Sequence, residues 1–543
     1  MIFRAGDRKM NDDQLQKIQK ILVGIMIALA LVVLGCLAVV FLSKIKKAPV
    51  AVEQTQTQET GLSDETTFLP DHCVLYDAMP NITFKDAEDQ EYSLSDFAGK
   101  PLVITFWASW CPDCHEQLEI VNECKTMAEE NGFTYILMDK LDNDKETKEQ
   151  ALAYLEENQI TVDTYFDDGL LIYDTLGMHN VPTTYFIDEN GILKALYGKQ
   201  ITTTSVFEAY LMNAKYGSEV VTENFVTSQM IEAGGMHSEY SKDSNKKTYQ
   251  SDVLSESQGL LLEYAVVKED QELFERSFAY VEDQMCRDAL PAWRVSNNKA
   301  DRVNALIDDL RIYRALVKAE ALWGGYDEQV ARYQENLKEY GLSKGKYIDF
   351  YDFKAKKPAD RFTLCYADFE VMSQLAEEDE EWKAAYDQAF SIVKNGKISS
   401  SFPLYYSWYS YDDSRYEETE LNMAEAMVTL FHLAEIGQLP QDTITWLDQQ
   451  LNGAGIMARY DVNGNVVTGY HYESTAIYAF AAMIGEEIGD AEMTGKALNK
   501  MEKMRINDTS LNYNGAFGNQ DGTGITSFDQ IVPMLAYAYC AEY

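Results

Sequence analysis

A pair of cysteines, two residues apart between an apolar run and an amphipathic segment, constrains the fold of this chain more than any other feature. The apolar run covers residues 102–107, and the cysteines are Cys111 and Cys114. The segment after them has the pattern of a helix, so the first thiol lies at a helix N-terminus, where unpaired N–H groups and the helix dipole favour a thiolate. Such a thiolate attacks disulfides, and the second cysteine resolves the mixed disulfide. The sequence therefore predicts a redox-active disulfide, Cys111–Cys114, and no other cofactor.

A zinc site is the alternative explanation of this spacing. A structural zinc site needs four ligands, but the chain has no second Cys-x-x-Cys and its histidines are scattered. We therefore predict no metal site. The other cysteines carry no motif and are expected to be buried thiols, with a further bridge such as Cys73–Cys124 left open.

The segment at residues 21–43 predicts a membrane anchor. Its uncharged part, residues 21–42, consists mostly of Leu, Val, Ile and Ala, and as a helix it spans about 33 Å, enough for a hydrocarbon core of roughly 30 Å. Lysines follow it where a cleavage site would need small residues, so we expect an uncleaved, single-pass helix. Basic residues are more numerous before the helix than after it, which favours a cytoplasmic segment at 1–20 and an extracytoplasmic body in the cell membrane.

Charge and composition restrict the partners and the domains. The net charge of -42 repels phosphate backbones, so no nucleic-acid partner is expected. A length of 543 residues predicts more than one large domain. Residues 44–76 are rich in Gln, Thr and Glu without an apolar period, which is typical of a flexible linker.

Strand and helix patterns alternate after this linker and predict an α/β sheet. Apolar runs at 102–107, 134–139, 181–188 and 192–197 alternate with helical patterns at 112–131, 145–158 and 204–215. The motifs Trp110-Cys-Pro-Asp-Cys114 and Val181-Pro-Thr-Thr-Tyr-Phe-Ile-Asp188 resemble those of the TlpA-type, membrane-anchored members of the thioredoxin-like family. The resemblance implies a thioredoxin-like domain over 77–217.

This resemblance also implies residue roles. Cys111 would be the nucleophile, Cys114 the resolving thiol and Pro182 a cis-proline facing the disulfide. Trp110 and Thr183 would contact the partner, a protein with a thiol or a disulfide.

The presence of one acid and the absence of another modify the expected chemistry of the two cysteines. Asp113, between the cysteines, raises the pKa of Cys111 and makes the site less oxidising. Thr105 stands where classical thioredoxins carry a buried acid, which leaves Asp139 and Glu116 as candidate proton acceptors for the second thiol.

Helical patterns fill the rest of the chain, residues 218–543. We count about twelve, and their approximate spans are 223–233, 252–269, 271–286, 301–323, 326–340, 361–377, 380–395, 417–436, 440–452, 473–488, 491–505 and 525–541. Such a series predicts paired helices that either close a ring or stack as a solenoid.

Three stretches of this region resemble signatures of family 8 glycoside hydrolases. They are Ser255-Glu-Ser-Gln-Gly259, Ala305-Leu-Ile-Asp-Asp-Leu-Arg-Ile312 and Tyr411-Asp-Asp-Ser-Arg415. The resemblance implies an all-α (α/α)6 toroid and inverting hydrolysis of a β-1,4-linked polysaccharide or oligosaccharide.

The same resemblance assigns the carboxylates. Inversion needs a protonated carboxyl and a carboxylate that holds water, roughly 6.5–9.5 Å apart. Glu256 is the implied acid, Asp412 the implied base, and Asp309 the aspartate that holds the sugar ring. Ile307 occupies the position of the family's first paired aspartate, so either Asp308 has taken over its role or the barrel is impaired and binds polysaccharide without cutting it.

Aromatic residues support a carbohydrate groove. Trp293, Tyr406 and Trp408 are candidates to stack on sugar faces, with a lining of the barrel core as the alternative. The sequence therefore predicts a thiol–disulfide oxidoreductase joined to a glycan hydrolase. The alternatives are a reductase joined to a glycan-binding barrel, or a redox module that maintains this protein's own cysteines.

Overall fold

The computed structural model describes residues 75–142, 144–241 and 252–540. The predicted anchor at 21–43 and most of the predicted linker lie outside these ranges, as does Cys73. Within the described ranges, no helix has both the length and the apolar content needed to cross a membrane.

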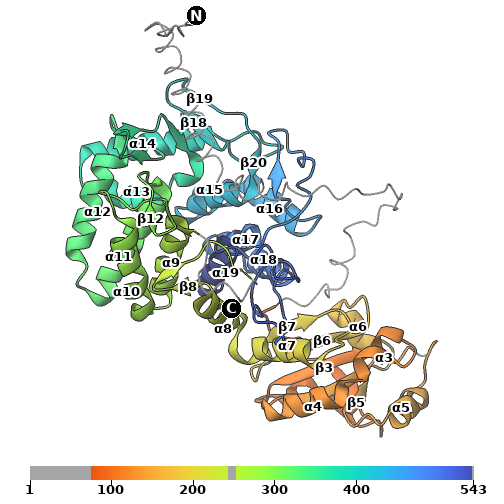
Figure 1. The fold of residues 1–543 in the computed structure, drawn as a ribbon. Helices are drawn as coiled ribbons and strands as arrows, with labels where there is room; N and C mark the ends of the chain where they lie inside the picture. Colours follow the sequence, from red (N-terminus) through yellow and green to blue (C-terminus); the bar gives the residue numbers. More distant parts are fainter. Residues whose placement is uncertain (1–74, 143, 242–251, 541–543) are drawn as a thin grey trace, which may run out of the picture. The chain divides into compact units, whose positions relative to one another are not determined.

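The first described domain contains a seven-stranded sheet in the order β2-β1-β5-β4-β3-β6-β7 (Figure 1). The strands are β1 (Thr83–Lys85), β2 (Glu91–Ser93), β3 (Leu102–Trp107), β4 (Thr134–Asp139), β5 (Asp163–Phe166), β6 (Thr183–Ile187) and β7 (Leu193–Tyr197). β3 runs parallel to β4 and antiparallel to β6. Every residue of β3 is buried, as expected for a continuous apolar run at the centre of a sheet that is covered on both faces.

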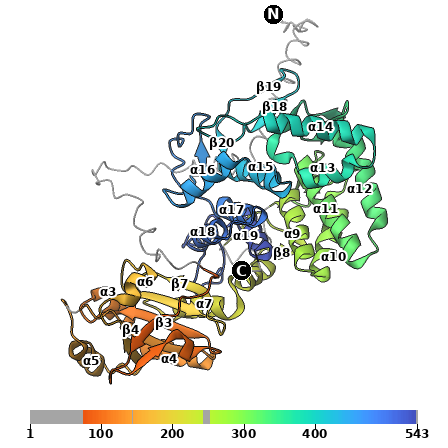
Figure 2. The same cartoon turned by 180° about the vertical axis from the view of Figure 1, so that it is seen from behind.

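Helices cover both faces of this sheet (Figure 2). They are α3 (Pro112–Leu118), α4 (Val121–Glu130), α5 (Lys148–Glu157), α6 (Leu171–Leu176) and α7 (Thr204–Tyr216). The single helix predicted at 112–131 is wrong in one respect, because the chain leaves the helix between α3 and α4. The apolar cluster on one face contains residues of α3, α4, α5 and α7 together with both cysteines, whereas α6 packs on the other face.

The second described domain confirms the twelve predicted helical patterns. Six helices form an inner ring: α9 (Ser255–Val267), α11 (Leu306–Trp323), α13 (Phe369–Ala376), α15 (Met423–Glu435), α17 (Thr475–Glu487) and α19 (Phe528–Tyr539). Six lie outside them: α8 (Ser218–Gln229), α10 (Gln271–Tyr280), α12 (Asp327–Tyr340), α14 (Glu380–Asn395), α16 (Gln441–Leu451) and α18 (Ala491–Glu502).

Contacts between the inner helices close the ring. α9 packs against both α11 and α19, and α15 and α17 continue the ring from α13 to α19 (Figure 1). The 3-10 turn Leu364–Tyr366, just before α13, contacts both α11 and α15 and closes the remaining side. The inner helices are buried on nearly all sides, as in α17, where residues 475–485 are all buried. A helix that is apolar all round needs neighbours all round. Of the two predicted arrangements, a closed ring and a stacked solenoid, the structure has the ring.

Short strand pairs, which the sequence pattern did not predict, lie in the loops between the helices. Those that bear on the site are β10 (Val253–Leu254), β11 (Arg294–Ser296), β17 (Arg361–Thr363), β18 (Trp408–Ser410), β19 (Arg415–Tyr416), β20 (Leu421–Asn422) and β21 (Arg459–Tyr460). The others are β8 (Ile231–Glu232), β9 (Gly235–Met236), β12 (Lys299–Ala300), β13 (Leu342–Ser343), β14 (Lys346–Tyr347), β15 (Tyr351–Asp352) and β16 (Lys357–Pro358). β10 and β20 end directly at the first residues of α9 and α15 and so fix where these inner helices begin.

Candidate active sites

The two cysteines of the first domain form a dithiol at the start of α3. Cys111 is the N-cap residue, and its Sγ accepts the backbone N–H of Cys114 at 3.2 Å. A hydrogen bond from the Cys114 thiol and this N–H lower the pKa of Cys111 to about 7, although burial and the charge of Asp113 oppose the shift. Burial raises the pKa of Cys114 far above its ordinary value. The pair therefore has the asymmetry of a nucleophile and a resolving thiol.

The loop before β6 faces this dithiol. The thiol of Cys111 donates to the carbonyl oxygen of Val181 at 3.4 Å, and the following bond to Pro182 is cis. Thr183 is buried, so its side chain lies inside the fold, while Trp110 is 37% exposed. Lys145 lies over the Trp110 ring with its Nζ 4.5 Å from the centroid. The exposed surface next to Cys111 is thus aromatic and partly cationic.

A neutral polar network occupies the position of the missing acid. The Thr105 hydroxyl lies 2.8 Å from the Tyr135 hydroxyl and 2.9 Å from that of Thr184. Gln117 donates its amide to Thr184 at 2.9 Å. These groups satisfy one another and carry no charge, so the network has no carboxylate to accept a proton.

Buried acids lie elsewhere on the same domain. Asp139 is fully buried at the end of β4, has no hydrogen-bond partner among the described residues, and has its pKa raised to about 9 by burial and by the charges of Glu146 and Asp167. Glu146, which the sequence did not single out, accepts the backbone N–H of Ser109 at 2.9 Å. Glu116, the other candidate, is exposed. Of the two candidate acceptors, only Asp139 belongs to the interior.

The barrel presents a second candidate site, a group of acidic residues at the N-terminal ends of its inner helices. Glu256, Asp308, Glu425 and Asp529 lie in the first turns of α9, α11, α15 and α19. We call these four residues the acid ring. Parallel inner helices begin at the same end of the barrel, and helix N-termini favour carboxylates. The sequence motifs pointed to Glu256 and Asp308, whereas Glu425 and Asp529 were missed although each has the same signal, an acid in the first turn of an inner helix.

The members of the acid ring act on one another electrostatically. Burial raises the pKa of Glu256 to about 7, and the charges of Asp308, Glu425 and Asp529 contribute in the same direction, against Arg311. Burial also raises the pKa of Asp308 to about 6. A carboxyl that keeps its proton near neutral pH is suited to act as a general acid.

The other two implied carboxylates are not members of this ring, although Asp309 follows Asp308 in the first turn of α11. Asp309 is fully buried and accepts the side-chain amide of Asn304, and burial raises its pKa well above the ordinary value. Asp412 is exposed in the turn between β18 and β19. Among the implied residues, the structure therefore brings Glu256 together with Asp308, and does not bring Asp309 or Asp412 into the acid ring.

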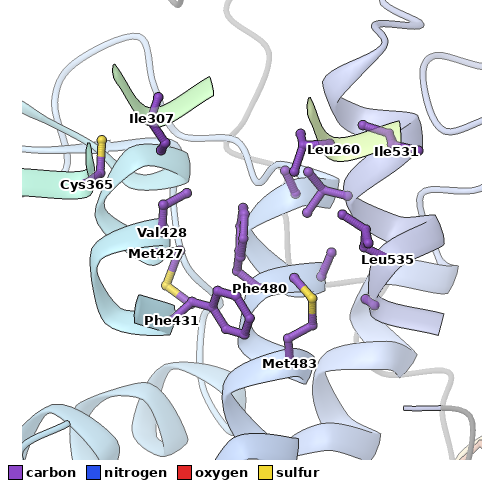
Figure 3. Close-up of a cluster of buried hydrophobic side chains, with 14 of the residues drawn as sticks. Leu260, Ile307, Cys365, Met427, Val428, Phe431, Phe480, Met483, Ile531 and Leu535 are labelled. Carbon is purple, nitrogen blue, oxygen red and sulfur yellow. The ribbon is translucent and has the colours of Figure 1, made fainter. Parts of the chain in front are cut away.

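Ile307 is part of the barrel core. Its side chain belongs to the large apolar cluster of the barrel, which also contains Val428 and Cys365 (Figure 3). The neighbouring Asp308 accepts the Ser255 hydroxyl and pairs with Arg311. The carboxylate at this helix end is thus supplied by the residue after Ile307.

Aromatic side chains line part of the site. Tyr406 lines a pocket together with Glu425 and stacks on Tyr416 at a centroid distance of 5.3 Å. Trp408 is partly exposed with Arg361 over its ring, and Trp293 is mostly buried. Tyr406 is therefore the predicted aromatic residue that shares a pocket with the acid ring.

Comparison with known proteins agrees with these two units. Residues 75–196 match the family model described as the AhpC/TSA family, so this part of the chain is a thioredoxin-like domain. The thiol-disulfide oxidoreductase ResA of Bacillus thuringiensis subsp. konkukian (strain 97-27) is 29% identical over 133 residues, which are 24% of this chain and 73% of ResA.

The helical domain has relatives of its own. The putative lipoprotein YdaJ of Bacillus subtilis (strain 168) is 29% identical over 297 residues, which are 53% of this chain and 79% of YdaJ. A solved structure described as a novel alpha-amylase from Clostridium perfringens aligns with a TM-score of 0.55 and 28% identity, covering 60% of this chain and 97% of that one. The helical domain therefore shares the barrel fold of a glycosidase.

Proposed function

We propose that the protein combines a thiol–disulfide oxidoreductase with a glycan hydrolase. The observation that carries the first activity is the position of Cys111, an N-cap thiol with a pKa of about 7 next to a buried second thiol. The similarity of the domain to ResA supports the same activity.

The dithiol reaction passes two electrons to the partner. The Cys111 thiolate attacks one sulfur of the partner's disulfide and releases the other as a thiolate, which forms a mixed disulfide. Cys114 then loses its proton and attacks the Cys111 sulfur, which forms the Cys111–Cys114 disulfide and releases the reduced partner. The exposed Trp110 and the loop at Pro182 are proposed to hold the partner chain, with buried Thr183 supporting that loop.

Reduction of insulin by the full-length protein with dithiothreitol as electron donor tests this activity. Precipitation of the insulin B chain well above the rate with dithiothreitol alone is the expected result. No acceleration, with Cys111 and Cys114 shown by alkylation to be reduced, would exclude it.

We propose that the barrel hydrolyses a glycan by inversion with Glu256 as general acid. Its pKa of about 7 and its place in the acid ring support this role. Tyr406, Trp408 and Trp293 are proposed to bind the sugar chain, and Asp309 to support the helix end from within. For the base, the sequence resemblance supports Asp412, but its exposed position in the turn between β18 and β19 does not favour this role.

The substrate is proposed to be a neutral or cationic glycan, because the acid ring disfavours polyanions. A β-1,4 linkage follows from the family 8 resemblance, and an α-linkage from the similarity to the amylase of Clostridium perfringens. Reducing-sugar release from β-glucan, xylan, chitosan and starch distinguishes them. Binding of a glycan without release would favour the alternative, a barrel that holds polysaccharide without cutting it.

The location of the protein is also a proposal. The apolar segment at 21–43 supports a single-pass anchor in the cell membrane with the described domains outside the cytoplasm. Protease treatment of intact cells, followed by detection of the thioredoxin-like domain, tests this topology.

A further inference from the structure

The acid ring contains a carboxylate whose function is not assigned by the sequence motifs. Hydrolysis by inversion needs, besides the acid Glu256, a second carboxylate that is ionised and has a free oxygen to hold the attacking water. The members of the acid ring and Asp412 are the residues to compare for this role.

Hydrogen bonds occupy two members of the ring. Asp529 accepts the hydroxyls of Ser474 and Thr526, one on each oxygen, at 3.2 and 2.9 Å. Asp308 accepts the Ser255 hydroxyl on one oxygen and faces Arg311 with the other. Both carboxylates are therefore committed to protein partners and hold helix ends in place.

Glu425 differs from them in its contacts. Among the described residues, its carboxylate has one hydrogen bond, which the side-chain amide of Asn422 donates to Oε1 at 3.3 Å. The Oε2 atom is not among the polar atoms of the described residues that are both fully buried and without a hydrogen bond. Besides Glu256, the proposed acid, Glu425 is therefore the ring member with an oxygen available for water.

The surroundings of Glu425 fit a reacting carboxylate. It lines a pocket with Tyr405, Tyr406, Asn422 and Thr429. Burial raises the pKa of Glu425, and Arg459, Arg361 and the Asn422 amide counteract part of this shift by stabilising the negative charge. Its own charge acts on Glu256, so the two carboxyl groups lie near each other.

Asp412 lacks these features. It is exposed in the turn between β18 and β19, and its charge is not among the largest that act on Glu256. We propose that Glu425 is the catalytic base that activates water opposite Glu256, and that Asn422 is a positioning residue that orients Glu425. This inference rests on the proposed glycan hydrolysis and replaces Asp412 in it.

In the proposed step, Glu425 removes a proton from water as the water oxygen attacks the anomeric carbon. The glycosidic bond breaks, and Glu256 gives its proton to the departing oxygen. The products are two shorter glycans, one with an inverted anomeric centre, and proton exchange with solvent restores both carboxyl groups.

Matched amide substitutions in the full-length protein test the proposal on whichever of β-glucan, xylan, chitosan and starch the wild type cleaves. Glu425→Gln should lower kcat roughly 10²–10⁴-fold with little change in KM, whereas Asp412→Asn should stay within about threefold, as expected for a surface side chain. Sodium azide, which needs no base, should restore turnover of Glu425→Gln and give a glycosyl azide of inverted configuration.

Asn422→Ala is the second variant, for the case in which Glu425→Gln does not fold. Loss of the amide should raise the pKa of Glu425 and move the acidic limb of the kcat profile to higher pH, which a purely structural role would not do. An unmoved limb, or a Glu425→Gln enzyme within tenfold of wild type, would overturn the inference. A wild type that cleaves none of the four glycans overturns the proposed hydrolysis itself, whereas loss of activity in Glu256→Gln but not in Glu425→Gln overturns only the base.

Discussion

The dithiol and the acid ring shift the pKa of a reactive group in opposite directions and by different means. The dithiol uses residues of one helix end, because Cys111 is the N-cap of α3 and its partner lies within the first turn. The acid ring uses first turns of four helices between residues 256 and 529. In the first site, local backbone and thiol hydrogen bonds lower a pKa. In the second, burial and the charges of distant residues raise one.

The largest effect should come from Cys111→Ser, which leaves no thiolate to attack a disulfide. Insulin reduction should fall at least about 1000-fold, to the rate without protein, because a serine hydroxyl is a poor nucleophile at neutral pH. Glycan hydrolysis by the same variant should be unchanged. Cys124→Ser is the control, since Cys124 is buried in α4 outside the dithiol, and equal loss in both variants would contradict the assignment.

Glu256→Gln should have the next largest effect, on the barrel alone. Loss of the general acid should lower kcat for glycan hydrolysis roughly 10²–10⁴-fold, while insulin reduction stays at the wild-type rate. The matched control is Glu272→Gln, which changes an exposed first-turn glutamate of the outer helix α10. A Glu256→Gln protein as active as Glu272→Gln would rule out Glu256 as the acid.

The pH dependences of the two activities should have opposite signs. Attack by Cys111 needs the thiolate, so the rate should rise as pH increases through about 7. Hydrolysis needs protonated Glu256, so its rate should fall as pH increases through about 7. Each limb should approach a tenfold change per pH unit away from the pKa, as expected for one titrating group. Rate profiles of both activities between pH 5 and 9, measured on one preparation, check this. If both rates rose or both fell with pH, the opposite protonation requirements of Cys111 and Glu256 would be contradicted.

The smallest effect concerns the stability of the thioredoxin-like domain. Asp139 has a pKa of about 9 in the folded domain, and an unfolded aspartate has about 3.9. The folded state therefore binds the extra proton, so stability falls as pH rises from about 4 to about 9. Asp139→Asn should remove this pH dependence. Relative to wild type, the free energy of unfolding of the variant should therefore be higher at pH 9 than at pH 5 by at least about 1 kcal/mol.

Hydrogen exchange of the β3 peptide in urea measures this difference within the full-length protein. Asp163→Asn, at an exposed position of β5, is the control. If both variants follow the wild-type pH dependence, Asp139 is not protonated in the folded domain.

The contrast also explains how far each site was predictable. Strand, dithiol and helix follow one another within residues 102–118, and local patterns report such a neighbourhood directly. The acid ring depends on which helices are inner and where each begins. Glu272 and Glu425 both lie in first turns, so an acid in a first turn does not by itself distinguish an exposed carboxylate from one whose charge acts on Glu256.

The sequence by itself determined the two kinds of fold, the twelve helical patterns and the dithiol, because these follow from periodicity and from residues close in the chain. Only the tertiary structure decided that the helices close into a ring, that Ile307 belongs to the core and Asp412 to an exposed turn, and that the charges of Glu425 and Asp529 act on Glu256. The physical reason is that burial and the charges of residues far apart in the chain set these environments, and both exist only once the helices have packed.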